Sequence, residues 1–229
     1  MIYALLTLVV VVVVFGPSLW VRAVVRHYGK ERPEIPGTGA ELAKHLIEKI
    51  GLEGVGVEVT DPNGDHYSPA EQMVRLSPAV HDGKSLSAIA IAAHEVGHAV
   101  QHHTGDTRLA LRTRMAPTVE RLGRLSILAI SVAPVLGLLT RHPIPMSALI
   151  AFGMVGLLAR VLLHMVTLPT EFDASFGKAL PILEAGQYVP EEELPAIRRI
   201  LRAAALTYVA AALAEVLNLT RWLAILLRR

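Results

Sequence analysis

The chain has 229 residues, of which 52% are apolar and 18% charged, and its mean hydropathy is positive. This balance is unusual for a soluble domain of this size and favours a membrane protein. A net charge of +2, with no Lys/Arg run interleaved with aromatic residues, excludes a nucleic-acid-binding surface. Because the chain has no cysteine, disulfides and thiolate metal sites are excluded, and any metal must be held by His, Asp or Glu.

The N-terminal segment is almost wholly apolar from Ile2 to Val25, with basic residues close behind. About 20 apolar residues suffice to cross the hydrocarbon core of a bilayer. A cleaved signal peptide is the alternative, but no positive charge precedes the apolar core and no clear cleavage site follows it. We therefore predict an uncleaved transmembrane anchor at residues 1–25.

A Pro- and Gly-rich linker at residues 33–39 separates the apolar N-terminal segment from a stretch of mixed polar and apolar composition. Thr38 and Glu41 have the spacing of a capping box and predict a helix that runs to about Ile50. We assign this helix to a small domain at residues 33–124.

The remainder of that domain mixes strand and helix patterns. Between Gly51 and Val80, short alternating apolar stretches flank the turn Asp61–Gly64, which predicts strands and a hairpin. Ser85 or Ser87 can cap the helix that follows, which we expect to end near Gly105.

Two apolar runs follow, at residues 125–139 and 146–168, with Arg141-His142-Pro143 between them. They predict an antiparallel transmembrane pair within residues 125–168. Such a pair returns the chain to its starting side, and it can bring residues 169–202 back to the small domain.

The C-terminal segment, residues 203–229, is apolar but contains Glu215, Asn218 and Arg221. It is either a fourth span with polar residues facing protein or an amphipathic interfacial helix. Basic loops after the first span and before the second predict that the small domain faces the cytoplasm. Arg228-Arg229 fits that orientation only if the last segment does not cross.

The motif His94-Glu95-Val96-Gly97-His98 lies in the apolar helix. Its two histidines share one helical face and can hold one metal ion, while Glu95 can act as general base towards a metal-bound water. Burying these side chains without partners would be costly, which disfavours a chance match. Gly97 is unfavourable inside a helix and indicates close approach of another backbone or a ligand.

A catalytic zinc ion normally has a third protein ligand and one open position. Glu171 directly follows the third apolar run, although a carboxylate near a helix start is also common for electrostatic reasons. Asp173 is a rival ligand, and Ser175 is a candidate donor that would support a ligand. Four other histidines are further candidate ligands: His66, His102, His103 and His164. The last three are more typical of exposed or snorkelling side chains.

Several segments resemble the YugP-like membrane zinc metallopeptidases, and the resemblance spans most of the chain. They are the N-terminal anchor, Gly37-Thr38-Gly39-Ala40-Glu41, Asp65-His66-Tyr67-Ser68-Pro69, Val74-Arg75-Leu76-Ser77, Ala92-Ala93-His94-Glu95-Val96-Gly97-His98-Ala99-Val100-Gln101-His102 and Leu168-Pro169-Thr170-Glu171-Phe172-Asp173-Ala174-Ser175.

The resemblance implies a gluzincin-like site with one zinc ion per chain and Glu171 as the third ligand. The plan is similar to that of HtpX-type peptidases, but those have an aspartate four residues after the glutamate, where this chain has Ser175. The strand containing Arg75 would suit substrate binding if it is an edge strand, and His66 or Tyr67 could donate to an oxyanion. Turn stabilisation explains the segment around His66 equally well.

Together these patterns predict a mainly α membrane protein, with transmembrane helices and a small α+β zincin-like domain that carries the HEXXH helix. We expect a multi-pass protein of the bacterial cell membrane, with a cytoplasmic active site that cuts membrane-associated or unfolded polypeptides. The alternatives are a site-2-type intramembrane protease and a catalytically idle zinc-binding scaffold.

Overall fold

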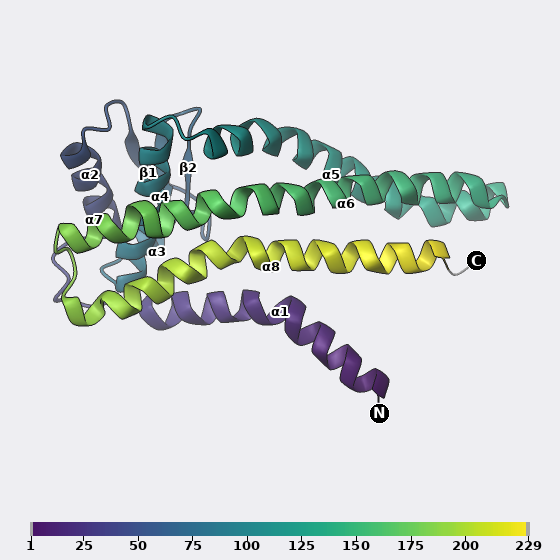
Figure 1. Cartoon of the computed structure of the whole chain (residues 1–229), viewed down its shortest axis with the longest axis horizontal. Helices are drawn as coiled ribbons and strands as arrows, with labels where there is room; N and C mark the ends of the chain where they lie inside the picture. Colours follow the sequence, from purple (N-terminus) through teal and green to yellow (C-terminus); the bar gives the residue numbers. More distant parts are fainter. Residues whose placement is uncertain (1, 228–229) are drawn as a thin grey trace. The chain divides into compact units, whose positions relative to one another are not determined.

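The computed structural model in Figure 1 describes the backbone of residues 2–227, and the side chains of residues 12, 15–220 and 222. It is mostly helical, with one small sheet. In chain order the elements are α1 (Ile2–Tyr28), α2 (Gly39–Ile50), β1 (Gly56–Val59), β2 (His66–Ser68), β3 (Met73–Leu76), α3 (Pro78–His81), α4 (Leu86–His103), α5 (Thr107–Thr140), α6 (Pro143–Phe172), the π-helix η1 (Asp173–Ala179), α7 (Leu180–Ala185), the 3₁₀-helix η2 (Glu191–Glu193) and α8 (Leu194–Leu227).

The chain forms two compact units, each built from segments far apart in the sequence. Unit 1 comprises Met1–Pro17, Leu111–Thr167 and Tyr208–Arg229, and unit 2 comprises Ser18–Ala110 and Leu168–Thr207. The long helices α1, α5, α6 and α8 each run from one unit into the other. The sheet and the motif helix α4 belong to unit 2.

The helices of unit 2 begin where their capping residues predict. The capping box at Thr38 and Glu41 is present in both directions, and α2 ends at Ile50, before Gly51 in the left-handed conformation. At the start of α4, the Ser85 hydroxyl accepts a hydrogen bond from Ala88 N at 3.1 Å. Both predicted helices are therefore confirmed.

The sheet has the order β1-β3-β2, and this differs from the predicted hairpin. β1 pairs with β3 in parallel, so the turn after β1 does not join two antiparallel neighbours. The hairpin is instead formed by β2 and β3, which pair through His66 and Arg75. β3 is therefore the central strand, and the expectation that the Arg75 strand is an edge is wrong, because β1 and β2 occupy its two sides.

The core of unit 2 surrounds α4. Val96 is fully buried on this helix, and it belongs to one apolar cluster with residues from the sheet, from α2 and from the segment after Glu171. Fully buried members of the cluster include Leu46, Val74, Leu76, Leu183, Ile197 and Ile200. Residues from the segment after Glu171 thus pack in the same core as the motif helix, and they form part of its surroundings.

Within unit 1, α5 and α6 pack as an antiparallel pair, as the two apolar runs predict. Ideal Cβ atoms on Gly153 and Gly156 of α6 would lie 2.2 Å from Ile130 Cγ1 and 1.9 Å from Ser126 Oγ. As the chain advances along α6, its residues contact progressively earlier residues of α5, so the two helices are antiparallel. Small residues of this kind allow membrane helices to approach closely.

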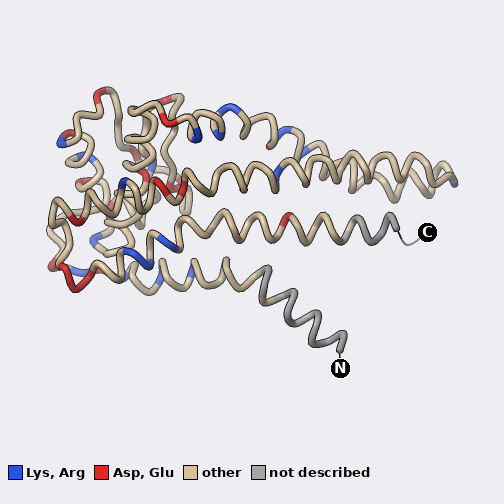
Figure 2. Tube along the Cα trace, in the orientation of Figure 1, with Lys and Arg blue, Asp and Glu red and all other residues tan. Residues whose placement is uncertain are grey.

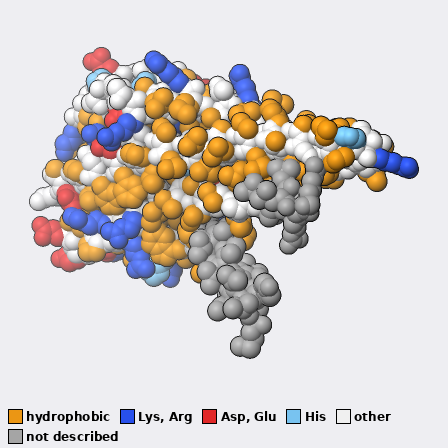
Figure 3. Space-filling view, turned by 45° about the vertical axis from the view of Figure 1, so that its right-hand side comes forward, with side chains coloured by type: hydrophobic (Ala, Val, Ile, Leu, Met, Phe, Trp, Pro, Cys, Tyr) orange, Lys and Arg blue, Asp and Glu red, His pale blue; other side chains and the backbone are white. Residues whose placement is uncertain are grey.

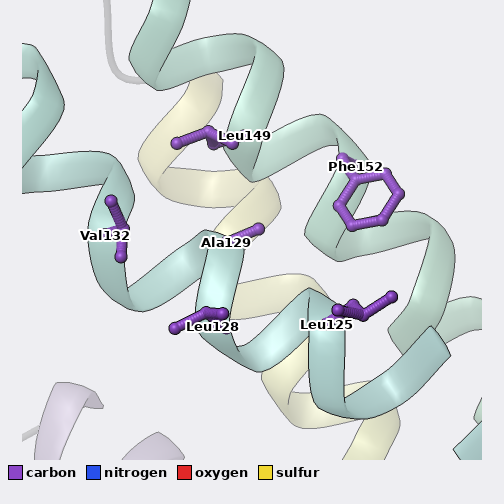
Figure 4. Close-up of a pocket in the computed structure, with 6 residues that line it drawn as sticks. All are labelled: Leu125, Leu128, Ala129, Val132, Leu149 and Phe152. Carbon is purple, nitrogen blue, oxygen red and sulfur yellow. The ribbon is translucent and has the colours of Figure 1, made fainter. Parts of the chain in front are cut away.

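Apolar side chains dominate the surface of this helix pair. Leu125, Leu138, Leu139 and Met165 are exposed, and hydrophobic side chains cover much of the visible face in Figure 3. The outer part of the pair is almost free of charge (Figure 2). A shallow pocket on this surface is wholly apolar (Figure 4) and is lined by Leu125, Leu128, Ala129, Val132, Leu149 and Phe152.

By length and composition, three helices among the described residues can cross a membrane: Thr107–Thr140, Pro143–Ala185 and Glu191–Thr220. The last of these includes much of the segment for which the sequence left two options. The predicted anchor at residues 1–25 lies in α1, but Met1 and most of the apolar side chains of that segment lie outside the described residues.

Candidate metal centre

The two motif histidines lie one turn apart on the buried face of α4. His94 and His98 are 4% and 5% exposed, and their rings meet edge to face with centroids 4.8 Å apart. Imidazoles buried this deeply need polar partners. The neighbouring segments supply them.

Gly97 allows another backbone to approach the motif. An ideal Cβ on Gly97 would lie 2.7 Å from Ala174 O, in η1. Any larger residue would push η1 away from α4, so the expectation of a close backbone contact at Gly97 is confirmed. The contact brings the segment around Glu171 against the two histidines.

Glu171, in the last turn of α6, completes a group of three. Its side chain is 2% exposed, and its Oε2 lies 3.2 Å from His94 Nε2 and 3.4 Å from His98 Nε2. One donor atom from each residue lies within 4.8 Å of the other two, so the group could hold a metal ion. The rival ligand Asp173 is not a member of this group.

Ser175 supports His94. Its hydroxyl lies 3.0 Å from His94 Nδ1 and 3.3 Å from Leu201 O. A hydroxyl has one hydrogen and can also accept, so Ser175 can bond both atoms at once. It lies where support of His94 as a ligand requires it, and His94 Nε2 lies on the side of Glu171.

His98 is held in the same way by Gln101, which the sequence interpretation did not single out. His98 Nδ1 lies 2.9 Å from Gln101 Oε1, and Gln101 is fully buried. The available signal was its position three residues after His98, since residues at this spacing are neighbours on a helix.

The donor set fits zinc. Zinc sites in proteins commonly combine imidazole nitrogen with carboxylate oxygen, and two tetrahedral ligands at 2.0–2.1 Å from the ion are about 3.3–3.4 Å apart. The Nε2 to Oε2 separations of 3.2 and 3.4 Å agree with this value. A cation bound between them would join the two imidazole nitrogens and the carboxylate without moving the ligand atoms far.

Glu95 follows the first ligand directly on α4 and is 6% exposed. It is not a member of the group formed by His94, His98 and Glu171. Glu95 thus lies beside the first ligand in the chain, but outside the group of three.

Three further residues singled out in the sequence lie on the sheet. His66 is exposed on the edge strand β2, and its Nδ1 lies 2.6 Å from Gly64 O. The Tyr67 hydroxyl lies 2.8 Å from His102 Nδ1, and burial raises the pKa of this phenol. Arg75 pairs with Glu58 and Glu71, and these hydrogen bonds raise the pKa of its guanidinium group.

Comparison with known proteins agrees with this geometry. Residues 3–227 match the family described as "Putative neutral zinc metallopeptidase". The chain belongs to this family. It is also 36% identical to "Putative membrane protease YugP" of Bacillus subtilis (strain 168), over 99% of this chain and 97% of that protein. No solved structure matches the chain significantly.

Proposed function

We propose that this member of the zinc metallopeptidase family is a membrane-bound endopeptidase, with one zinc ion held by His94, His98 and Glu171. The convergence of the two Nε2 atoms and Glu171 Oε2 in a buried group carries the proposal. The buried polar contacts with Ser175 and Gln101 support it, since zinc-bound histidines normally bond through their second nitrogen.

Glu95 is the proposed general base. A zinc ion bound at this site would lower the pKa of its water to about 7 and polarise the carbonyl of a peptide bond. The Glu95 carboxylate accepts the proton of the attacking water and returns it to the leaving amine. Its location next to His94 on a rigid helix keeps it close to the reacting groups.

A zincin-like domain would bind its substrate as an extended strand, and β1 and β2 have free edges for this among the described strands. β2 carries His66 and Tyr67, the two candidates for oxyanion stabilisation. Arg75 is held by two carboxylates on the central strand, so we assign it to sheet stability.

The proposed substrates are membrane-associated or unfolded polypeptides. Glu171 belongs to a continuous helical segment, Pro143–Ala185, that is long and apolar enough to cross a membrane. The candidate ligand therefore directly follows a lipid-compatible run. We propose a multi-pass protein of the bacterial cell membrane, with its site on the cytoplasmic side as the basic loops indicate.

Two alternatives have less support. A site-2-type intramembrane protease carries its motif on a membrane helix, whereas α4 packs in the core of unit 2 and is not among the candidate spans of the described residues. An idle zinc scaffold has no need of Glu95, and a structural site usually has four protein ligands.

Zinc content and casein cleavage test the proposal, on detergent-purified wild type, Glu95→Gln and Glu171→Ala. We expect Glu95→Gln to retain zinc and lose at least about 100-fold in cleavage rate, as general bases contribute this much. Glu171→Ala should lose both zinc and activity. Glu48→Gln, on the exposed end of α2, is the matched control and should behave as wild type.

Equal cleavage by wild type and by Glu95→Gln, at equal zinc content, would assign the activity to a contaminant and favour the scaffold. Full zinc content in Glu171→Ala would remove Glu171 from the ligand set.

A further inference from the structure

Outside the three candidate ligands, Gln101 on α4 is one of three fully buried polar residues near the site, with Thr170 and Ser175. We propose that Gln101 is a positioning residue that orients the ring of His98 through its Nδ1 atom and holds the Glu171 segment against α4. This inference rests on the proposed zinc site.

Gln101 connects two parts of the chain through its single amide group. Its Oε1 lies 2.9 Å from His98 Nδ1, and its Nε2 donates to Thr170 O at 2.9 Å and to Asp173 Oδ2 at 2.8 Å. Thr170 directly precedes Glu171, and Asp173 follows it by two residues. One side chain thus joins a ligand on α4 to both sides of the ligand on α6.

The orientation of this amide follows from its partners. A backbone carbonyl and a carboxylate can only accept hydrogen bonds, so the atom that faces Thr170 and Asp173 must be the NH₂ group. The oxygen of Gln101 is then committed to His98, whose Nδ1 must carry the proton. This contact turns the Nε2 atom of His98 towards Glu171, the direction in which a bound cation would meet it.

Asp173 is held in position by its own surroundings. Its Oδ2 lies 3.8 Å from Lys178 Nζ, and an ideal Cβ on Gly177 would lie 2.3 Å from its Oδ1. The absence of a side chain at Gly177 thus leaves space for the Asp173 carboxylate within η1. The α-helix gives way to the wider π-helix at Asp173. The Thr170 carbonyl, which accepts from Gln101, lies three residues before this change.

Alternative roles for Gln101 predict different behaviour. If it only fills space, Gln101→Met, which has similar volume and no hydrogen-bonding amide, should bind zinc as wild type does. If it positions His98, that variant should bind zinc about 10- to 100-fold more weakly, as expected on losing a partner of a ligating histidine.

The test measures the zinc Kd by competition with a chromophoric chelator, and the visible absorption spectrum of the Co²⁺-loaded protein. Full-length wild type, Gln101→Met and the double variant Gln101→Glu with Asp173→Asn are compared. In the double variant the introduced carboxylate at position 101 accepts from His98 and from the introduced amide at position 173. The donor to Thr170 O is lost, so we expect the zinc affinity to recover in part. The Kd and spectrum of the double variant should lie closer to wild type than to Gln101→Met.

Ser87→Ala is the matched control, because Ser87 is also buried on α4 and its hydroxyl donates to Val25 O at 2.9 Å, away from the site. It should leave the Kd and the Co²⁺ spectrum unchanged. If Gln101→Met does not yield a monodisperse protein, the double variant decides alone. A spectrum and Kd close to those of wild type then support the proposal, and loss of metal binding overturns it.

Wild-type zinc affinity and an unchanged Co²⁺ spectrum in Gln101→Met would also overturn the positioning role. This result is separable from failure of the proposed activity. If Gln101→Met loses affinity while Glu95→Gln still cleaves casein as wild type does, the peptidase proposal fails and the positioning role stands.

Discussion

Both units bury polar side chains, but they use them differently. In unit 2, Ser175 and Gln101 bind the outer nitrogens of His94 and His98, so that the inner nitrogens converge on Glu171. In unit 1, Arg160 Nη1 on α6 donates to Glu215 Oε1 on α8 at 3.0 Å, and Glu215 Oε2 has no hydrogen-bond partner among the described residues. The first network orients the candidate metal ligands, whereas the second joins the apolar helices α6 and α8.

In both units a glycine allows two helical segments to pack closely, but the segments differ in their roles. Gly97 brings a candidate ligand segment against the motif, while Gly156 brings α6 against Ser126 of α5. Changes that displace the segment around Glu171 in unit 2 should therefore alter metal binding, and changes in unit 1 should alter stability alone.

Breaking the ion pair of unit 1 should have the largest effect on stability. Glu215→Ala removes the carboxylate that pairs with the partly buried Arg160, and we expect a loss of about 3 kcal/mol, the lower end of the range for buried pairs. Thermal unfolding in detergent measures this, and the zinc Kd should not change. The double variant Arg160→Met with Glu215→Leu should recover stability, and failure to do so would show that the two side chains act separately.

Gly97→Ala should damage the candidate metal site. The added methyl would overlap Ala174 O, and we expect a loss of about 1–3 kcal/mol, as overpacking typically costs. The displacement of η1 should also weaken zinc binding. Gly16→Ala is the control, since among the described side chains its Cβ would meet only Val12 Cγ1, at the ordinary contact distance of 3.9 Å. Unchanged zinc affinity in Gly97→Ala would mean that the ligands tolerate movement of η1.

Gly156→Ala tests the same packing principle in unit 1. The methyl would overlap Ser126 Oγ at 1.9 Å, which predicts a similar loss of about 1–3 kcal/mol. The melting temperature in detergent should fall, while the zinc Kd stays at the wild-type value. Weaker zinc binding here would contradict the separation of roles between the units.

The smallest effect should come from the α2 cap. Thr38→Ala removes the acceptor for Glu41 N, and we expect a loss of about 1 kcal/mol. Zinc binding should not change, because the capping box touches none of the candidate ligands. Thr38→Ser keeps the acceptor and should melt close to wild type.

Local signals in the sequence were sufficient for much of this protein. Thr38 and Ser85 predict the starts of α2 and α4, since a cap depends only on residues within one turn. The spacing of His94 and His98 predicts a shared helical face for the same reason. The apolar runs predict the α5–α6 pair because their length and composition alone decide whether they suit a bilayer.

Strand order and ligand support were decided by the tertiary structure. The sequence predicted a hairpin near Asp61 but not the parallel pairing of β1 with β3, because partners in a sheet are chosen by long-range packing. Glu171 and Asp173 are both acidic residues near one helix end, and the geometry alone separates the residue beside the histidines from the one that binds Gln101. For Gln101, the sequence offered only its spacing from His98. Its role depends on two acceptors, Thr170 O and Asp173 Oδ2, which folding brings from a distant part of the chain.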